Sequence, residues 1–260
     1  MNYPRQFVDQ MHRSFGLNQR PLRIVSLVPS QTELLYHLGL DAEVVGQTLF
    51  CIHPAEQHLV KPRVGGTKKL DINKIRNLKP DLIIGNKEEN KQSEIVELMQ
   101  EFPVWMSDIK NLEDALEMIL SIGNLVGKPE RAKEIHQQIS AGFEALVQTE
   151  KKETCVYLIW RNPWMAAGGY TFIDDMLSRC GYINLAKGEL SRYPELQAEW
   201  LLAQQPANIF LSSEPYPFKE KHLAELQAIC VSARIKLVDG ELFSWYGNRL
   251  IASAKYFKSL

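Results

Sequence analysis

The chain has 260 residues, with 30 Lys and Arg against 31 Asp and Glu and a formal net charge of −1. Hydrophobic residues make up 45% and charged residues 23%, which excludes a fully disordered or fibrous chain. The balanced charge gives no general attraction to nucleic acid, so we expect no nucleic-acid partner. The length suits one large α/β domain or two lobes of roughly 100–130 residues each.

Residues 1–21 form a polar leader segment in which we expect one short helical stretch. Polar residues interrupt every apolar run there, whereas a secretory signal needs roughly 7–15 apolar residues in a row. This favours a cytoplasmic location, unless a signal was removed. No run of about 18 apolar residues occurs, so we expect no transmembrane segment. The widely spaced cysteines are expected to be reduced and mostly buried; they are Cys51, Cys155, Cys180 and Cys230.

Residues 22–110 alternate short apolar runs with amphipathic stretches, the pattern of a mostly parallel sheet with helices between its strands. Strands are expected at 23–27, 44–48, 81–84 and 103–106, and helices at about 29–38, 71–78 and 94–99. Residues 111–150 instead show two helices separated at Gly127-Lys128-Pro129. The second is expected from Pro129 or Glu130 to about Val147, because Pro suits a first helical turn. About 20 helical residues would span roughly 30 Å.

The alternation restarts in residues 151–260, where strands are expected at 155–160, 208–211 and 235–238. Helices are expected at 172–180, 221–229 and 249–257, and a short helix within 194–204. A helix end, a Pro and a strand occur at 77–84 and again at 203–211, which supports two lobes. The predicted fold is therefore α/β, with two Rossmann-like lobes of mostly parallel sheets (22–110 and 151–260) joined by one long backbone α-helix. A ligand cleft is expected between the lobes.

Common enzyme motifs are missing from the sequence. It has no Gly-x-Gly-x-x-Gly, P-loop, His-Glu-x-x-His or Gly-x-Ser-x-Gly stretch. We therefore expect no nucleotide cofactor, no catalytic residues and a protein that is not an enzyme. The glycine-rich stretch at 65–68 is interpreted as a turn.

Cys51 and His53 are the candidate metal-binding residues. In an extended segment residues i and i+2 point the same way, so both could face one metal or ligand. Two ligands leave a structural zinc site incomplete. The alternatives are a buried thiol and a turn histidine before Pro54. An alternative function is a cytosolic metal-dependent enzyme that uses Cys51, His53 and the pair Glu88-Glu89.

Polar and aromatic side chains follow several predicted strands, where the carboxyl ends of parallel strands face a binding crevice. Asn86 and Lys87 open a charged loop that either lines this crevice or is a solvated helix start. Three later loops carry aromatic and arginine residues, which together predict a flat, aromatic-walled site for a large ligand. Each such cluster alone is more often a packing feature; the three together favour the site. The candidates are Trp160, Arg161, Trp164, Tyr170, Arg192, Tyr193, Trp245 and Tyr246.

Residues 23–34 (Arg-Ile-Val-Ser-Leu-Val-Pro-Ser-Gln-Thr-Glu-Leu) and 79–84 (Lys-Pro-Asp-Leu-Ile-Ile) resemble the substrate-binding proteins of ABC importers for vitamin B12 and iron–siderophores. The resemblance extends from about residue 22 to 258. It implies two α/β lobes, a long backbone helix, a shallow cleft and small lobe movement. The implied ligand is a corrinoid such as cobalamin or a related metal chelate, including haem or a ferric siderophore, and the implied location is periplasmic. Residues 50–54 and 86–90 resemble a branch of this helical-backbone metal receptor family that lacks a leader.

The same resemblance implies roles for individual residues. Pro29 and Ser30 look like the first-lobe loop that touches the ligand. Phe50 stands where the B12-binding member has a cleft tyrosine, and Thr67 stands where it has a cleft tryptophan. Residues 160–164 and 245–246 match second-lobe loops that face the ligand.

Exported members of this family dock on arginines of the membrane permease through one surface Glu per lobe. Glu199 matches the second-lobe Glu, whereas Asn73 stands where the first-lobe Glu would be. The resemblance therefore implies weak or absent permease docking, because an amide cannot replace the carboxylate in a charge-assisted pair. We expect a monomer.

Overall fold

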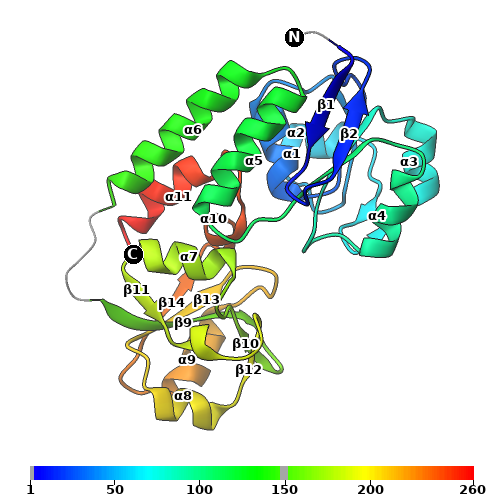
Figure 1. Cartoon of the computed structure of the whole chain (residues 1–260). Helices are drawn as coiled ribbons and strands as arrows, with labels where there is room; N and C mark the ends of the chain where they lie inside the picture. The colour runs from blue at the N-terminus through cyan, green and yellow to red at the C-terminus, as the bar shows by residue number, and fades with distance from the viewer. Residues whose placement is uncertain (1–2, 147–151) are drawn as a thin grey trace. The chain divides into compact units, whose positions relative to one another are not determined.

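The structure is a computed structural model that describes residues 3–146 and 152–260, and the chain divides into two compact units (Figure 1). Unit 1 comprises Met1–Ile109, Glu113–Ser140 and Trp245–Ile251; unit 2 comprises Lys110–Leu112, Ala141–Ser244 and Ala252–Leu260. Among the described residues, no helix combines the length and apolar character that a membrane span needs.

Unit 1 is built on a four-stranded parallel sheet in the order β4-β3-β7-β8. Its strands are β3 (Ile24–Ser26), β4 (Val44–Gln47), β7 (Leu82–Asn86) and β8 (Val104–Ser107). Every residue of β3, β7 and β8 is buried, as expected for a parallel sheet covered on both faces. Helices α1 (Pro29–His37), α3 (Ile72–Leu78) and α4 (Gln92–Met99) contact these strands. The strand and helix order predicted for residues 22–110 is confirmed.

The N-terminal residues form a β-hairpin, so the short helix expected there is wrong. Strand β1 (Arg5–Val8) pairs antiparallel with β2 (Ser14–Leu17), and the rings of Phe7 and Phe15 stack across the pair with centroids 6.2 Å apart. Asp9 closes the turn, because its Oδ1 accepts hydrogen bonds from the backbone N–H groups of Met11 and Arg13 at 2.9 Å each. Cross-strand aromatic pairing and an Asp-closed turn both stabilise a hairpin.

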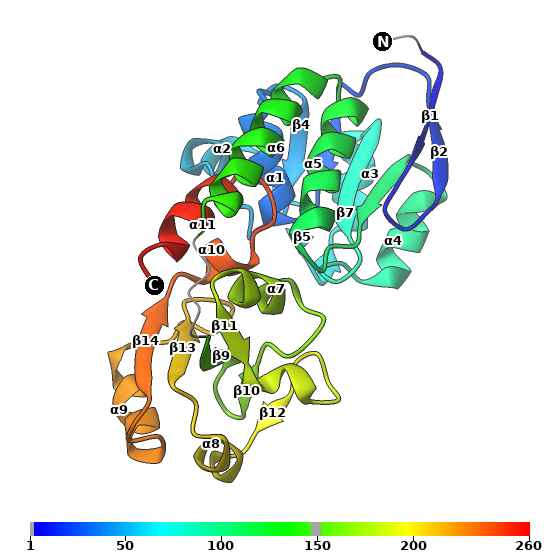
Figure 2. The same cartoon turned by 60° about the vertical axis from the view of Figure 1, so that its left-hand side comes forward.

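Two long helices follow the first sheet. Helix α5 (Leu112–Leu125) and helix α6 (Pro129–Glu144) lie side by side in Figures 1 and 2. Gly123 allows their close approach, since a Cβ there would lie 2.2 Å from the Cβ of Ala132. Helix α6 starts at Pro129 as predicted and is helical to Glu144; the expected end near Val147 lies outside the described residues.

Unit 2 contains a six-stranded sheet in the order β12-β10-β9-β13-β14, with β11 also paired to β9. The parallel strands are β9 (Glu153–Trp160), β11 (Tyr182–Asn184), β13 (Asn208–Ser212) and β14 (Arg234–Val238). Two short antiparallel strands that the sequence did not indicate extend it, β10 (Trp164–Ala166) and β12 (Glu195–Leu196). The helices are α7 (Phe172–Arg179), α8 (Ala198–Gln204), α9 (Glu220–Ile229), α10 (Gly240–Ser244) and most of α11 (Leu250–Phe257), whose first two residues belong to unit 1. The α/β class with mostly parallel sheets is confirmed.

Four further short elements of the described chain were not predicted: α2 (Ala55–Val60), β11, the 3₁₀ turn Leu185–Gly188 and α10. The glycine-rich turn was predicted correctly, because β5 (Gly65–Gly66) pairs with β6 (Lys69–Leu70) across Thr67 and Lys68. Gly65 has a φ of +96°, and a Cβ there would lie 2.4 Å from the carbonyl oxygen of Lys69. The turn therefore depends on glycine at position 65.

Candidate functional site

A buried cluster of hydroxyl and thiol groups lies behind the loop that connects β3 to α1. Ser30 opens α1 directly after Pro29 and is almost fully buried. The Oγ1 of Thr32 lies 2.7 Å from the Oγ of Ser26 and 3.1 Å from the Sγ of Cys51. Pro29 and Ser30 thus form the first turn of α1, not a loop, and these contacts fix that turn relative to the first sheet of unit 1.

Cys51 is buried within this cluster. Its Sγ also lies 3.1 Å from the Oγ1 of Thr48. Burial raises the pKa of the Cys51 thiol, although hydrogen bonds from Thr32 and Thr48 act in the opposite direction. A protonated thiol is neither a good nucleophile nor a good metal ligand. The residues that the structure describes contain no group of three or more His, Cys, Asp or Glu side chains arranged for a metal ion. The arrangement favours the buried-thiol interpretation over the metal-dependent enzyme.

His53 is partly buried and contacts an aromatic ring from a distant part of the chain. The rings of His53 and Trp245 are 5.4 Å apart at an interplanar angle of 70°, an edge-to-face arrangement. Both residues belong to unit 1, because the segment Trp245–Ile251 packs with that unit. The sequence had placed Trp245 and Tyr246 among the loops of the second lobe. Both side chains are largely buried, with 7% of Trp245 exposed.

Arg249 connects the same segment to α1. Its Nε and Nη2 donate hydrogen bonds to Oε2 and Oε1 of Glu33, at 2.9 Å each. Its guanidinium carbon lies 4.7 Å from the centroid of the Trp245 ring. Gly247 lies close to the first turn of α1, since a Cβ there would lie 2.8 Å from the carbonyl oxygen of Ser30. We name Glu33, His53, Trp245 and Arg249 the tryptophan cluster.

Sequence reasoning did not identify Glu33 or Arg249 as site residues. The two residues pair with each other across 216 positions, and a single sequence carries no signal for such a pair. The only available indication was that Arg249 ends a loop rich in aromatic residues.

Phe50 and Thr67 come together at the β5–β6 turn. A Cβ at Gly66 would lie 3.2 Å from the Phe50 ring, which places that ring against the turn. Phe50 is 59% exposed, a large value for an aromatic side chain. Thr67 is mostly buried, and its carbonyl oxygen accepts a hydrogen bond from the Nδ2 of Asn90 at 3.1 Å. Phe50 therefore presents an aromatic surface to solvent, whereas Thr67 presents almost none.

Asn86 stabilises the loop after β7. Its Oδ1 accepts hydrogen bonds from the backbone N–H groups of Glu88 and Glu89 at 2.8 and 3.0 Å, and its Nδ2 donates to the Oγ of Ser107 at 2.9 Å. The next residue, Lys87, is exposed and pairs with Asp108 at 2.7 Å. This arrangement gives Asn86 a structural role in the loop and leaves Lys87 as its accessible charge.

The first aromatic loop of unit 2 has one exposed and one buried tryptophan. Trp160 is 41% exposed and packs edge-on against Tyr216 with centroids 5.6 Å apart. Trp164 belongs to the hydrophobic core of unit 2, where it stacks on Phe218 at an interplanar angle of 8°. Arg161 lies over the Trp164 ring at 4.2 Å and pairs with Glu225. Trp160 is thus the accessible tryptophan of this loop.

Tyr170, Arg192 and Tyr193 lie together on another part of unit 2. The Nε of Arg192 donates to the carbonyl oxygen of Tyr170 at 3.0 Å, and its guanidinium carbon lies 5.7 Å from the centroid of the Tyr193 ring. Tyr170 is 80% exposed. The structure therefore brings these three predicted residues into one group, in which Tyr170 is exposed and Arg192 and Tyr193 are partly buried.

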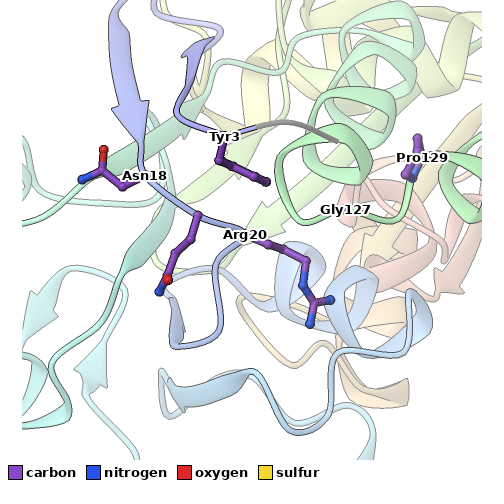
Figure 3. A pocket seen from close by; sticks show the side chains of 6 residues that line it. Tyr3, Asn18, Arg20, Gly127 and Pro129 are labelled. Atoms are coloured by element: carbon purple, nitrogen blue, oxygen red, sulfur yellow. The ribbon is translucent and has the colours of Figure 1, made fainter.

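A pocket of about 580 Å³ lies elsewhere in unit 1 (Figure 3). It is lined by Tyr3, Asn18, Gln19, Arg20, Gly127 and Pro129. None of the predicted site residues is among them. The guanidinium of Arg20 pairs with Glu43 at 3.2 Å. The pocket is therefore distinct from the candidate site.

A family model and curated relatives both match this chain. A family model described as periplasmic binding protein matches residues 24–230. The curated vitamin B12-binding protein of Vibrio campbellii is 27% identical over 194 residues, which cover 73% of this chain and 70% of that protein. The corresponding protein of Vibrio cholerae is 28% identical over 198 residues, with the same coverage.

Solved structures show the same fold. The periplasmic heme-binding protein RhuT from Roseiflexus sp. RS-1, in its apo form, has a TM-score of 0.81 at 22% identity, covering 91% of this chain and 96% of its own. The periplasmic vitamin B12-binding protein BtuF of Vibrio cholerae has a TM-score of 0.77 at 23% identity, covering 92% and 96%.

Proposed function

The chain belongs to the periplasmic binding protein family, and from this membership we propose that it binds a corrinoid of the cobalamin class and delivers it unchanged to an ABC permease on which it docks weakly. One observation carries the ligand class: curated vitamin B12-binding proteins match 73% of the chain. Members of the family are solute-binding proteins, and the proposed role requires no catalytic step.

The exposed aromatic and cationic side chains suit a large, flat, amphipathic ligand. Phe50 offers an accessible ring on unit 1, and Trp160 and Tyr170 offer accessible rings on unit 2. Aromatic faces and guanidinium groups bind planar ligands through stacking and cation–π contacts. These side chains support the proposed ligand class by their chemistry.

We divide the predicted residues into contacts and supports. Proposed contacts on unit 1 are Pro29, Phe50, His53 and Lys87, together with the largely buried Ser30, Thr67, Trp245 and Tyr246, which would contribute the small surface that they expose. Proposed contacts on unit 2 are Trp160, Arg161, Tyr170, Arg192 and Tyr193. Cys51, Asn86 and Trp164 are assigned a supporting role, because the thiol and the amide are used in buried hydrogen bonds and Trp164 belongs to the core of unit 2.

Haem is the second candidate ligand, because the tryptophan cluster of unit 1 contains the imidazole of His53. His53 packs against Trp245, and histidine is a common axial ligand of haem iron. A ferric siderophore would bring its own iron ligands and would need no such imidazole. Because the pKa of the Cys51 thiol is raised, a thiolate contact from Cys51 to the cobalt of a corrinoid or to the iron of haem is unfavourable.

Delivery to a permease involves the two surface positions named above. Glu199 is exposed in the first turn of α8, and Asn73 is exposed in α3. The description of the family places its members in the periplasm, and the cytoplasmic location expected from the N-terminal sequence gains no support from the family match. A monomer remains our expectation.

The test is a spectral titration of the whole chain with cyanocobalamin, haemin and a ferric siderophore in parallel. Saturable one-to-one binding of cyanocobalamin in preference to the other two supports the proposal. Binding of haemin alone, with loss of affinity in His53→Ala, replaces it with the second candidate. Flat titrations with all three probes contradict both.

A further inference from the structure

We infer that Arg249 is a positioning residue for Trp245: held by Glu33, it fixes the orientation of the indole beside His53 and thereby raises the affinity of unit 1 for a planar ligand. The orientation part depends only on the tryptophan cluster. The affinity part rests on the proposed function.

The ion pair between Glu33 and Arg249 is suited to fixing a direction. Two parallel N–H···O contacts of 2.9 Å prevent rotation of the guanidinium plane, whereas a single contact would allow it. The two side chains are only 16% and 18% exposed, so solvent screens the pair less than a surface pair. Arg249 therefore offers Trp245 a cation of fixed position.

The indole receives two further constraints. The guanidinium carbon lies 4.7 Å from its centroid, within the range of a cation–π contact, and the ring of His53 lies 5.4 Å away. The backbone is also restrained, because Gly247 lies so close to the carbonyl oxygen of Ser30 that even a methyl group would clash. A tryptophan with a fixed backbone and only two side-chain torsions loses little further freedom when a ligand binds. The arginine contact therefore pre-organises the indole.

A second arginine, Arg161, has a comparable arrangement in unit 2. Arg161 also lies over a tryptophan and pairs with a glutamate, Glu225. There, however, Trp164 is stacked on Phe218 within the hydrophobic core of unit 2. Core packing restrains that indole independently of the arginine. Trp245 is similarly buried, but the ring 5.4 Å from it is the imidazole of His53, and its cation is held by Glu33.

The orientation is measured without any ligand by ¹⁹F NMR of protein labelled with 5-fluorotryptophan. The chain has five tryptophans, and Trp245→Phe identifies the resonance of position 245. We expect Arg249→Met and Glu33→Gln to shift or broaden that resonance. Arg249→Lys keeps the charge but loses the two-point contact, so we expect an intermediate effect. Arg76→Met removes an exposed arginine that pairs with Glu97 and Glu101, and should leave the resonance unchanged.

The affinity is measured on the same variants with cyanocobalamin and haemin. Loss of a charge-assisted contact and of its cation–π partner should weaken binding about tenfold in Arg249→Met and in Glu33→Gln. Melting temperatures show whether each variant is folded at the temperature of measurement.

The outcomes separate the inference from the proposed function. An unchanged Trp245 resonance in folded Arg249→Met and Glu33→Gln overturns the positioning role. A shifted resonance with unchanged affinity overturns its effect on binding. A shifted resonance in a protein that binds neither probe leaves the positioning supported and overturns the proposed function.

Discussion

Glu33 and Arg249 form a two-point ion pair across 216 residues of sequence, with both donor–acceptor distances at 2.9 Å. The pair joins the first helix of unit 1 to a segment near the end of the chain. Residues 245–251 consequently belong to unit 1, and Trp245 lies beside His53. An aromatic residue that sequence order assigns to one lobe thus belongs structurally to the other unit.

The first prediction concerns the stability of this pair. Removing one partner leaves a largely buried charge without its counter-ion, so Arg249→Met should lower the free energy of unfolding by about 2 kcal/mol. Urea unfolding of the two single variants and of Glu33→Gln/Arg249→Met measures the coupling energy. The double variant should lose clearly less than the sum of the single variants; strictly additive losses would show that the pair contributes no coupling.

The second prediction concerns Trp245 as a ligand contact. Trp245→Ala should weaken cyanocobalamin binding by roughly 2 kcal/mol or more, the range of a binding hot spot. Trp200→Ala in α8 is the matched control, because that tryptophan lies outside the candidate site and donates to Glu189 instead. Both affinity and melting temperature are measured. Unchanged affinity in folded Trp245→Ala would remove this residue from the site.

The third prediction concerns alkaline pH. Burial raises the pKa of the Cys51 thiol and raises that of Cys180 to about 12. The unfolded thiols ionise near their ordinary value of about 8.5, while the folded ones stay protonated. The stabilisation that these protonated thiols give the folded state is therefore complete below about pH 8.5, and it is lost as pH rises toward the raised pKa of each thiol in the folded protein.

Chemical unfolding at about pH 8 and about pH 10 measures this effect. The unfolding free energy should fall with pH, and Cys51→Ser should reduce the slope. Native Cys51 should also resist alkylation until denaturant is added. A slope that is the same in Cys51→Ser and the unsubstituted chain would mean that this thiol does not contribute.

The fourth prediction concerns the permease. Asn73 lacks a charge, and the Nη1 of the neighbouring Arg76 lies 3.4 Å from its Oδ1. The family resemblance implies that docking uses arginines of the permease. The positive charge of Arg76 and the missing carboxylate at position 73 should both disfavour the approach of such an arginine. We expect weak capture by a B12-type permease in nanodiscs, stronger capture by Asn73→Glu, and no gain from Asn77→Glu on the same helix. Tight capture of the unsubstituted chain would contradict this prediction.

The central strands were predictable because their apolar runs are continuous. Strands such as β7 and β13 are buried along their whole length, and such runs are recognisable in a single sequence. The N-terminal hairpin was not, because β1 is short and mostly exposed, half of its residues are polar, and its turn depends on the side chain of Asp9. Local polarity alone does not distinguish such a strand from a leader.

The site was only partly predictable, since aromatic loops after strands were recognised but their burial was not. Trp160 and Trp164 are four residues apart, yet one is accessible and the other packs on Phe218, which lies 54 positions further along the chain. The grouping of Trp245 with unit 1 likewise depends on Ser30 and Glu33, which contact its segment only in the folded chain.

Isothermal titration of the whole chain with cyanocobalamin tests the central claim most directly. We predict saturable binding with a stoichiometry of one and a negative heat-capacity change, because a corrinoid would bury apolar surface against aromatic rings. The signal should weaken strongly in Trp245→Ala and persist in Trp200→Ala. An absence of saturable binding in folded protein would contradict the claim that this member of the periplasmic binding protein family takes a cobalamin.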